Sequence, residues 1–299
     1  MNNYKHQVRL LLSVIPEVAK EKCFALHGGT AINLFVRDMS RLSVDIDLTY
    51  IPIENRTTSF SNINNALGEI KKRLNTIFPN LLIEHQKDKL KLQISDKGAL
   101  IKIEVNQGIR GLLGDTSTLV LCNKAQEDFD VFCSIQGVSF GQLYGGKIVA
   151  ALDRQHPRDL FDVKDLLDNE GFTEEIKEGF IFTLLSSKRP IKEVLFPNLI
   201  NQEQAFENQF MGMTERLFSY VDFEQTREKL IENIQEELTE SDKKFIVNFE
   251  NTSPDWSVYD FEKFPAIQWK LQNLQSLKES NPKKHTFNMK ELKRLLINY

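Results

Sequence analysis

Two aspartates separated by a single residue, Asp45 and Asp47, are the clearest sign of chemistry in this sequence. Val44, Ile46 and Leu48 alternate with them, and successive side chains of a β-strand point to opposite faces. Both carboxylates are therefore expected on one face of a strand, above an aliphatic face that packs into the core. Like charges this close disfavour their ionised forms unless a cation lies nearby. The pair predicts either a metal-binding site or a solvated face of a sheet.

A glycine pair upstream favours the metal site. Gly28 and Gly29 separate an apolar run, residues 24–26, from residues 31–35, where apolar side chains recur at helical spacing. Glycines at such a junction let the backbone and the positive helix end approach a phosphate, and Thr30 can add a hydroxyl. A phosphate-binding turn followed by metal-binding acids suits phosphoryl transfer, in which the metal neutralises the phosphates that the turn holds. The spacing matches neither the P-loop nor the dinucleotide-binding fingerprint.

A third acid, Glu104, belongs to the second of two alternating segments, residues 89–95 and 101–106. Apolar and polar side chains alternate in both segments, so we predict two strands with Glu104 on a polar face. The pattern alone leaves two interpretations open. Glu104 is one more surface glutamate, or it stands beside Asp45 and Asp47.

The sequence around these acids resembles a known family. The run HGGT is followed by Arg41, Ser43, Asp45 and Asp47. This pattern is similar to the glycine turn and Asp-x-Asp signature of the nucleotidyltransferase superfamily, whose polymerase-beta-like palm carries three acids. With KIVAALDRQHPRDLFD downstream, the chain more narrowly resembles the AbiEii/AbiGii toxin family of abortive-infection and toxin–antitoxin systems. The resemblance covers about residues 20–170, and beyond it only FPAIQWKLQNL is similar, with low specificity.

The resemblance implies an α+β fold with two domains. A nucleotidyltransferase palm, a mixed sheet flanked by helices, is expected over residues 1–138, followed by a mainly α-helical C-terminal domain over residues 139–299. It also implies that three acids are catalytic and bind Mg²⁺, with Mn²⁺ as an alternative: Asp45, Asp47 and Glu104. The residues expected to bind the NTP substrate are Gly28, Gly29, Thr30, Ser43, Lys147, Arg158 and Asp159.

Two helices are predicted after the palm, over residues 140–154 and 157–167, and their short connection implies antiparallel packing. On spacing alone, Lys147 is an ordinary solvated lysine of the first helix. The resemblance gives it a phosphate-binding role, for which a mobile ammonium group is suited. Arg158 and Asp159 either contact the substrate or belong to an internal ion-pair network. That network would also contain Arg154 and Asp162.

The rest of the pattern is mostly helical. Residues 4–22 predict an amphipathic helix that Pro16 bends or breaks, and residues 49–60 predict a loop before a helix that ends at Phe78. Helical periodicity dominates from Phe172 onward. A last helix is expected after Pro282.

Composition sets further bounds. Apolar residues make up 41% and charged residues 27% of 299 residues, which is ordinary for a globular protein. The three cysteines lack metal-type spacing and no stretch of about 18 apolar residues occurs, so we expect a cytoplasmic protein without membrane contact. The net charge of −4 indicates no global affinity for nucleic acid, but residues 278–299 carry a local net charge of +4. That tail is either a solvated helix face or a contact for RNA phosphates.

The predicted function is metal-dependent transfer of an NMP from an NTP to an acceptor, an activity of the EC 2.7.7 type. The resemblance implies a growth-inhibiting toxin that acts on RNA, such as the acceptor end of tRNA, and that a cognate antitoxin protein neutralises. Two alternatives stay open. The acceptor is a small molecule or a protein, or the chain is a catalytically silent NTP-binding protein.

Overall fold

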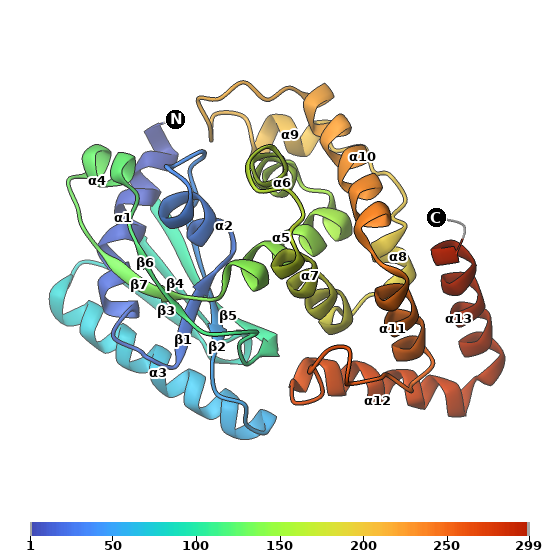
Figure 1. The fold of residues 1–299 in the computed structure, drawn as a ribbon. Helices are drawn as coiled ribbons and strands as arrows, with labels where there is room; N and C mark the ends of the chain where they lie inside the picture. Colours follow the sequence, from blue (N-terminus) through green and yellow to red (C-terminus); the bar gives the residue numbers. More distant parts are fainter. Residues whose placement is uncertain (1, 298–299) are drawn as a thin grey trace. The chain divides into compact units, whose positions relative to one another are not determined.

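The structure, a computed structural model, describes residues 2–297 and divides into two compact units (Figure 1). Unit 1 consists of residues 1–139 and 209–217, and unit 2 of residues 140–208 and 218–299. The division expected from the sequence, with one boundary after residue 138, lacks the return of residues 209–217 to unit 1. We call these residues the return segment.

Unit 1 is built on a seven-stranded sheet with the strand order β3-β4-β5-β2-β1-β7-β6. Its strands are β1 Phe24–His27, β2 Asp45–Tyr50, β3 Leu82–Gln86, β4 Lys91–Asp96, β5 Ala99–Arg110, β6 Ser117–Val120 and β7 Ser134–Gly137. β2 pairs with β5 and β1 with β7 in parallel, and the other neighbours are antiparallel. The sheet is therefore mixed, and the predicted α+β class is confirmed.

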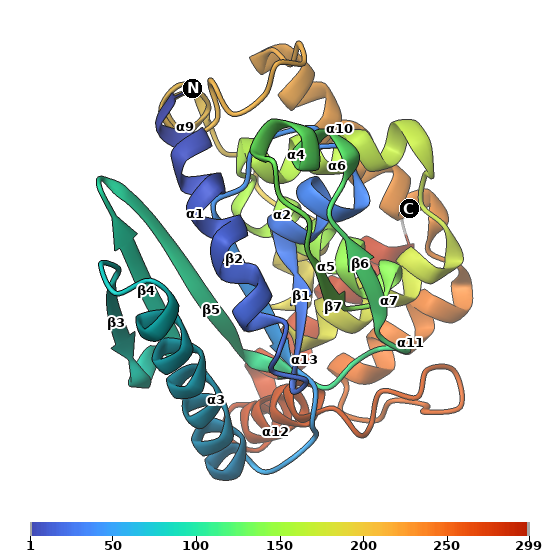
Figure 2. The same cartoon turned by 90° about the vertical axis from the view of Figure 1, so that its left-hand side faces the viewer.

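Helices flank this sheet. They are α1 Asn2–Val18, the short α2 Gly28–Thr30 continued by a π-helix Ala31–Val36, α3 Arg56–Ile77, a 3₁₀ turn Lys87–Lys89 and α4 Asn123–Phe129. Figure 2 shows α1 and α3 in front of the sheet, where α1 packs on β5 and β7 and α3 on β3 and β4. Their apolar faces are buried there, as the helical spacing predicted.

Two expected boundaries in unit 1 are wrong. The helix expected over residues 4–22 is α1, which ends at Val18, two residues beyond Pro16. The predicted loop over residues 49–60 ends early, since α3 begins at Arg56. The side chain of Asn55 accepts a hydrogen bond from the backbone N–H of Thr58 at 2.9 Å and so caps that helix.

Among its described residues, unit 2 contains helices and connecting loops but no strand. Its helices are α5 Phe140–Arg154, α6 Pro157–Asn169, α7 Glu174–Ser186, α8 Ile191–Leu195, α9 Glu203–Gln209, α10 Tyr220–Glu237, α11 Glu240–Glu250, α12 Pro265–Ser280 and α13 Pro282–Ile297. α5 and α7 approach closely through Gly141, Gly145 and Gly179, where a methyl group would overlap the facing backbone. The predicted basic tail falls on α12 and α13, and its last two residues lie outside the described part of the chain. Within residues 2–297, no helix is long and apolar enough to cross a membrane.

Candidate active site

The three predicted acids occur on two neighbouring parallel strands. Asp45 and Asp47 are half-buried on β2, while Ile46 and Leu48 beneath them are fully buried, so the predicted alternation is correct. In the register between β2 and β5, Asp47 is paired with Glu104. Paired residues of adjacent strands point to the same face of a sheet. The sheet therefore brings Glu104 beside Asp47, as the second interpretation of this glutamate required.

The glycine turn lies directly against Asp47. His27, the last residue of β1, is paired with Asp47, so the turn begins next to this carboxylate. Gly28 has a φ of +74°, and a Cβ atom at this position would lie 2.5 Å from Asp47 Oδ2. Only glycine combines this backbone conformation with this clearance. The close approach joins the turn and the acid in one site.

The loop between the turn and β2 packs on the second glycine. A Cβ atom on Gly29 would lie 2.8 Å from Arg41 Nη2 and 3.2 Å from Ser43 Oγ. Asn33, which is fully buried, donates a hydrogen bond to the carbonyl of Gly29 at 3.0 Å and accepts one from the backbone N–H of Arg41 at 3.2 Å. Asn33 thus ties the turn to the loop that carries Arg41 and Ser43.

Thr30 connects the turn to the start of β2. Its side chain is fully buried, and its hydroxyl donates to the carbonyl of Asp45 at 2.5 Å. A second hydrogen bond of 3.0 Å joins it to Ser43 Oγ. These bonds hold the backbone of Asp45 in place. The predicted contact of Thr30 with a phosphate stays a prediction.

The acids differ in how well they fit a metal ion. Among the described residues, no group of three or more His, Cys, Asp or Glu side chains is gathered closely enough to hold one. Carboxylate oxygens are the ligands that Mg²⁺ prefers, and Asp45 and Asp47 supply them on one strand face. Glu104, 42% exposed, is held by Lys91 of β4 at 2.5 Å. The donor set therefore fits a metal at Asp45 and Asp47, and Glu104 would have to leave Lys91 to join them.

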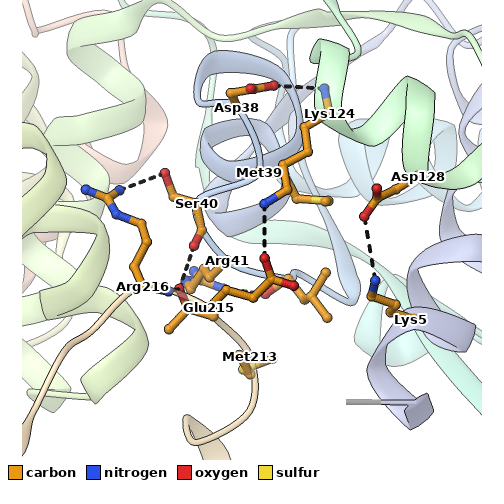
Figure 3. A pocket seen from close by; sticks show the side chains of 12 residues that line it. Lys5, Asp38, Met39, Ser40, Arg41, Lys124, Asp128, Met213, Glu215 and Arg216 are labelled. Carbon is orange, nitrogen blue, oxygen red and sulfur yellow. Dashed lines mark hydrogen bonds and ion pairs between the residues drawn. The ribbon is translucent and has the colours of Figure 1, made fainter.

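The return segment supports the loop that carries Arg41 (Figure 3). The backbone N–H of Leu42 donates to the carbonyl of Met213 at 2.7 Å, and Thr214 Oγ1 donates to the carbonyl of Ser40 at 2.8 Å. Arg216 Nη1 donates to Ser40 Oγ at 3.1 Å. A cavity of about 280 Å³ lies beside these contacts. The return segment thus holds the loop from the side of the cavity.

Four polar residues of unit 2 form an internal ion-pair network: Lys147, Arg154, Asp159 and Asp162. Lys147 is only 6% exposed, and its Nζ lies 3.0 Å from both Asp159 Oδ1 and Asp162 Oδ2. Asp159 also accepts hydrogen bonds from Arg154 Nε at 2.5 Å and Arg154 Nη2 at 2.9 Å. The backbone N–H of Arg158 donates to His156 Nδ1 at 3.2 Å, which caps α6. The nucleotide contacts of Lys147, Arg158 and Asp159 stay predictions.

Burial and charge act in opposite directions on Asp159. Burial of this carboxyl group, which is 1% exposed, would raise its pKa. The ammonium of Lys147 and the guanidinium of Arg154 outweigh that effect and hold the pKa of Asp159 well below its usual range. The carboxylate therefore remains ionised inside the unit and stabilises the two cations around it.

Sequence reasoning missed three contributors to the site: Asn33, Lys91 and the return segment. Asn33 left a signal, because a polar residue stands among the apolar residues 31–35 at a helical position that is buried. Lys91 belongs to a predicted strand, but its pairing with Glu104 depends on strand register. Nothing in residues 209–217 indicates their return to unit 1.

The fold has a counterpart among solved structures. It is similar to the solved structure of MenT4, a nucleotidyltransferase toxin from Mycobacterium tuberculosis, with a TM-score of 0.60, 12% sequence identity and coverage of 89% of this chain and 93% of that one. At this identity, the likeness concerns the fold alone.

The family follows from the sequence. Residues 9–273 match the family described as nucleotidyl transferase AbiEii toxin, type IV toxin–antitoxin system. The chain therefore belongs to the AbiEii family of nucleotidyltransferase toxins, as the resemblance of its motifs implied. No curated protein matches the sequence significantly.

Proposed function

We propose that this protein transfers an NMP from an NTP to a hydroxyl group of RNA, such as the acceptor end of tRNA, and releases pyrophosphate. The observation that carries the proposal is the close approach of Gly28 to Asp47. A Cβ atom at position 28 would lie 2.5 Å from Asp47 Oδ2. A turn suited to phosphate and an acid suited to a cation share one site there. Phosphoryl transfer needs both at the same triphosphate.

The turn and the adjoining loop would bind the triphosphate. The backbone N–H groups of Gly28 and Gly29 offer donors without steric hindrance, and the buried Arg41 adds a positive charge next to Gly29. Ser43 adds a hydroxyl, and Thr30 keeps β2 in register with the turn. Lys147, Arg158 and Asp159 remain proposed nucleotide ligands.

The chemical step exchanges the phosphoanhydride bond between the α- and β-phosphates for a phosphodiester bond to the acceptor. The acceptor oxygen attacks the α-phosphorus, the bond to pyrophosphate breaks, and the hydroxyl proton passes to a carboxylate, for which Glu104 is the candidate. Mg²⁺, or Mn²⁺ in its place, would be held by Asp45 and Asp47 and would neutralise the triphosphate while lowering the pKa of the attacking hydroxyl. Glu104 is alternatively a further ligand of the metal.

The family supports a biological setting for this reaction. A toxin of a type IV toxin–antitoxin system has an antitoxin encoded with it, and we propose that a cognate antitoxin prevents the action of this protein. A small-molecule or protein acceptor and a silent NTP-binding role are the alternatives. Each gives a different result in the following experiment.

The test is transfer of radiolabel from each α-labelled NTP to total cellular RNA in the presence of Mg²⁺. We expect one preferred NTP to label RNA with the wild type and none to do so with Asp45→Asn. Asp96→Asn is the matched control, because it removes the same charge from the end of β4. Label on protein or on small molecules alone would contradict an RNA acceptor.

A growth assay separates the toxin from a silent binding protein. Cells that express the wild type should stop growing, and cells that express Asp45→Asn should grow like cells that carry an empty vector. Equal growth of both strains, together with NTP binding in vitro and no labelled product, would reject catalysis by this site.

A further inference from the structure

One face of α13 combines positive charges with an exposed ring. Lys283, Phe287, Lys290 and Arg294 follow one another at spacings of four, three and four residues, which puts them on one side of a helix. Phe287 is 59% exposed. Within the described chain, Lys283 and Lys290 form no ion pair, whereas Arg294 pairs with Glu291 at 3.3 Å. The face therefore carries charge that the protein itself does not neutralise.

A cavity of about 400 Å³ is lined in part by the same helix. Asn288, the neighbour of Phe287, lines it together with Lys188. Lys192 lies next to Phe287, with its Nζ 5.6 Å from the ring centroid. The cavity is also lined by Trp269 of α12, whose side chain is 59% exposed. Trp269 and Lys188 thus border the cavity. Lys192 connects it to Phe287, because Lys192 contacts that ring and acts on Glu250 in the cavity lining.

The lining of the cavity is suited to a flat ring with polar edges. Leu274 and Leu277 contribute apolar surface, and Ser186, Asn273 and Asn288 contribute hydrogen-bonding groups. The volume falls within the range of roughly 300–1,000 Å³ that small-molecule sites occupy.

One acid also lines the cavity. Burial raises the pKa of Glu250, although Lys270, His285 and Lys192 act against that shift. A carboxyl group with a raised pKa carries less negative charge near neutral pH than an exposed one. Glu250 therefore opposes an anionic ligand less than its type suggests.

We propose that this surface of unit 2 binds single-stranded RNA, with one base stacked on Trp269 at the cavity, a second on Phe287, and phosphates on Lys188, Lys192, Lys283 and Lys290. Aromatic platforms beside a positive surface are how proteins bind single strands. Lysine is depleted in protein–protein interfaces, so the lysines favour RNA over an acidic protein. An RNA acceptor is part of the function proposed above, and the role of this surface in the reaction rests on that proposal.

The test measures fluorescence anisotropy of a fluorescein-labelled, single-stranded RNA of twelve nucleotides, without NTP or divalent metal. Trp269→Ala and Phe287→Ala should each weaken binding about ten-fold, because stacking of one base is lost. Trp269→Phe keeps a ring and should recover most of the affinity. In Lys283→Ala/Lys290→Ala, the slope of log K against log salt should fall by about 1.4, at roughly 0.7 for each phosphate contact on single strands.

The matched control is Lys164→Ala/Lys229→Ala, which removes the same two charges from another cavity of unit 2. It should bind RNA like the wild type. A thermal melt of every variant checks its folding. Little change is expected, because Lys164 pairs at the surface and Phe287 and Trp269 are each 59% exposed. Unchanged affinity and salt slope in the patch variants would overturn the proposal. Patch variants that still bind RNA but no longer bind poly-L-glutamate would also overturn it, because the surface would then recognise an acidic protein.

RNA affinity and transfer of label to RNA are measured separately, so each proposal can fail without the other. Asp45→Asn should keep the wild-type affinity for the RNA, because Asp45 belongs to unit 1. Patch-dependent RNA binding without any labelled RNA in the transfer assay would support this surface and reject the proposed reaction. Labelled RNA with patch variants that bind RNA normally would support the reaction and reject this surface.

Discussion

The acids of the Asp45–Asp47 face in unit 1 and those of the Lys147 network in unit 2 differ in how deeply they are buried. Asp45 and Asp47 stay half-buried on one strand face, with the backbone of Gly28 against the second of them. Asp159 is buried, and two cations contact its carboxylate. A half-buried carboxylate keeps part of its surface within reach of a ligand, whereas a fully buried one contacts only groups of its own unit. Acids of the same family motifs thus have different surroundings: one pair lies on a half-buried strand face, and the other acid lies in a buried ion-pair network.

The largest expected effect is that of Asp47→Asn on catalysis. Loss of a charge needed in the transition state lowers the rate by about 10³-fold, while Asn has nearly the shape of Asp and the site is only half-buried. Transfer of label to RNA should therefore vanish while the melting temperature changes little. A large fall in melting temperature would remove the contrast between the two regions.

Asp159→Asn, in contrast, should strongly lower the free energy of unfolding. Breaking a buried ion pair leaves an uncompensated charge and costs about 3–5 kcal/mol, so urea unfolding should detect a large loss. Asp168→Asn is the control, because it breaks an exposed pair with Lys164, 2.6 Å apart in the same helix, which contributes roughly 0.3–0.5 kcal/mol. Equal losses in both variants would contradict the structural role of the network.

The effect of Asp159 should depend on pH in a defined direction. Its pKa is depressed in the folded state, so the stabilisation is complete above the unfolded pKa of about 3.9 and is lost as pH falls towards the folded pKa. The difference in unfolding free energy between the wild type and Asp159→Asn should be constant from neutral pH to about pH 4 and shrink below it. A difference in unfolding free energy that grows as pH falls would contradict a depressed pKa of Asp159 in the folded state.

Gly28→Ala should strain the backbone and also displace Asp47, and Gly98→Ala is the control that separates these two effects. Gly28 and Gly98 both have positive φ, +74° and +91°, but a Cβ atom meets Asp47 only at Gly28, and nothing lies within 4 Å at Gly98. Backbone strain of about 1 kcal/mol is expected in both alanine variants. Only Gly28→Ala should also reduce transfer to RNA, because it displaces Asp47. Equal activity of the two variants would argue against the contact between the turn and the acid.

The smallest expected effect is that of Thr214→Val in the return segment. It removes the hydrogen bond of 2.8 Å to the carbonyl of Ser40, worth about 0.5–1.5 kcal/mol, and should raise the KM for NTP more than it lowers kcat. Thr76→Val removes a similar bond on the surface of α3, 3.1 Å long, and is the control. An unchanged KM in Thr214→Val would show that the loop with Arg41 holds its position without this bond.

Local pattern by itself determined much of this protein. The alternation of Asp45 to Leu48 predicted a strand with both acids on one face, because the period of two is a property of the backbone. Local sequence also predicted the glycine turn, the helices α5 and α6 and the family, because each depends on residues close together in the chain. The short elements β6 and α4 were missed, because so few positions establish no period when no motif marks the segment.

Only the tertiary structure decided how these parts meet. The register that brings Glu104 beside Asp47, and Lys91 beside Glu104, depends on which strands pair and where. Thr214 and Ser40 are 174 positions apart, and no local preference specifies their hydrogen bond. The burial of Lys147 likewise results from packing around α5 and α6. Such contacts follow from the summed burial of apolar side chains throughout the chain, which no single motif encodes.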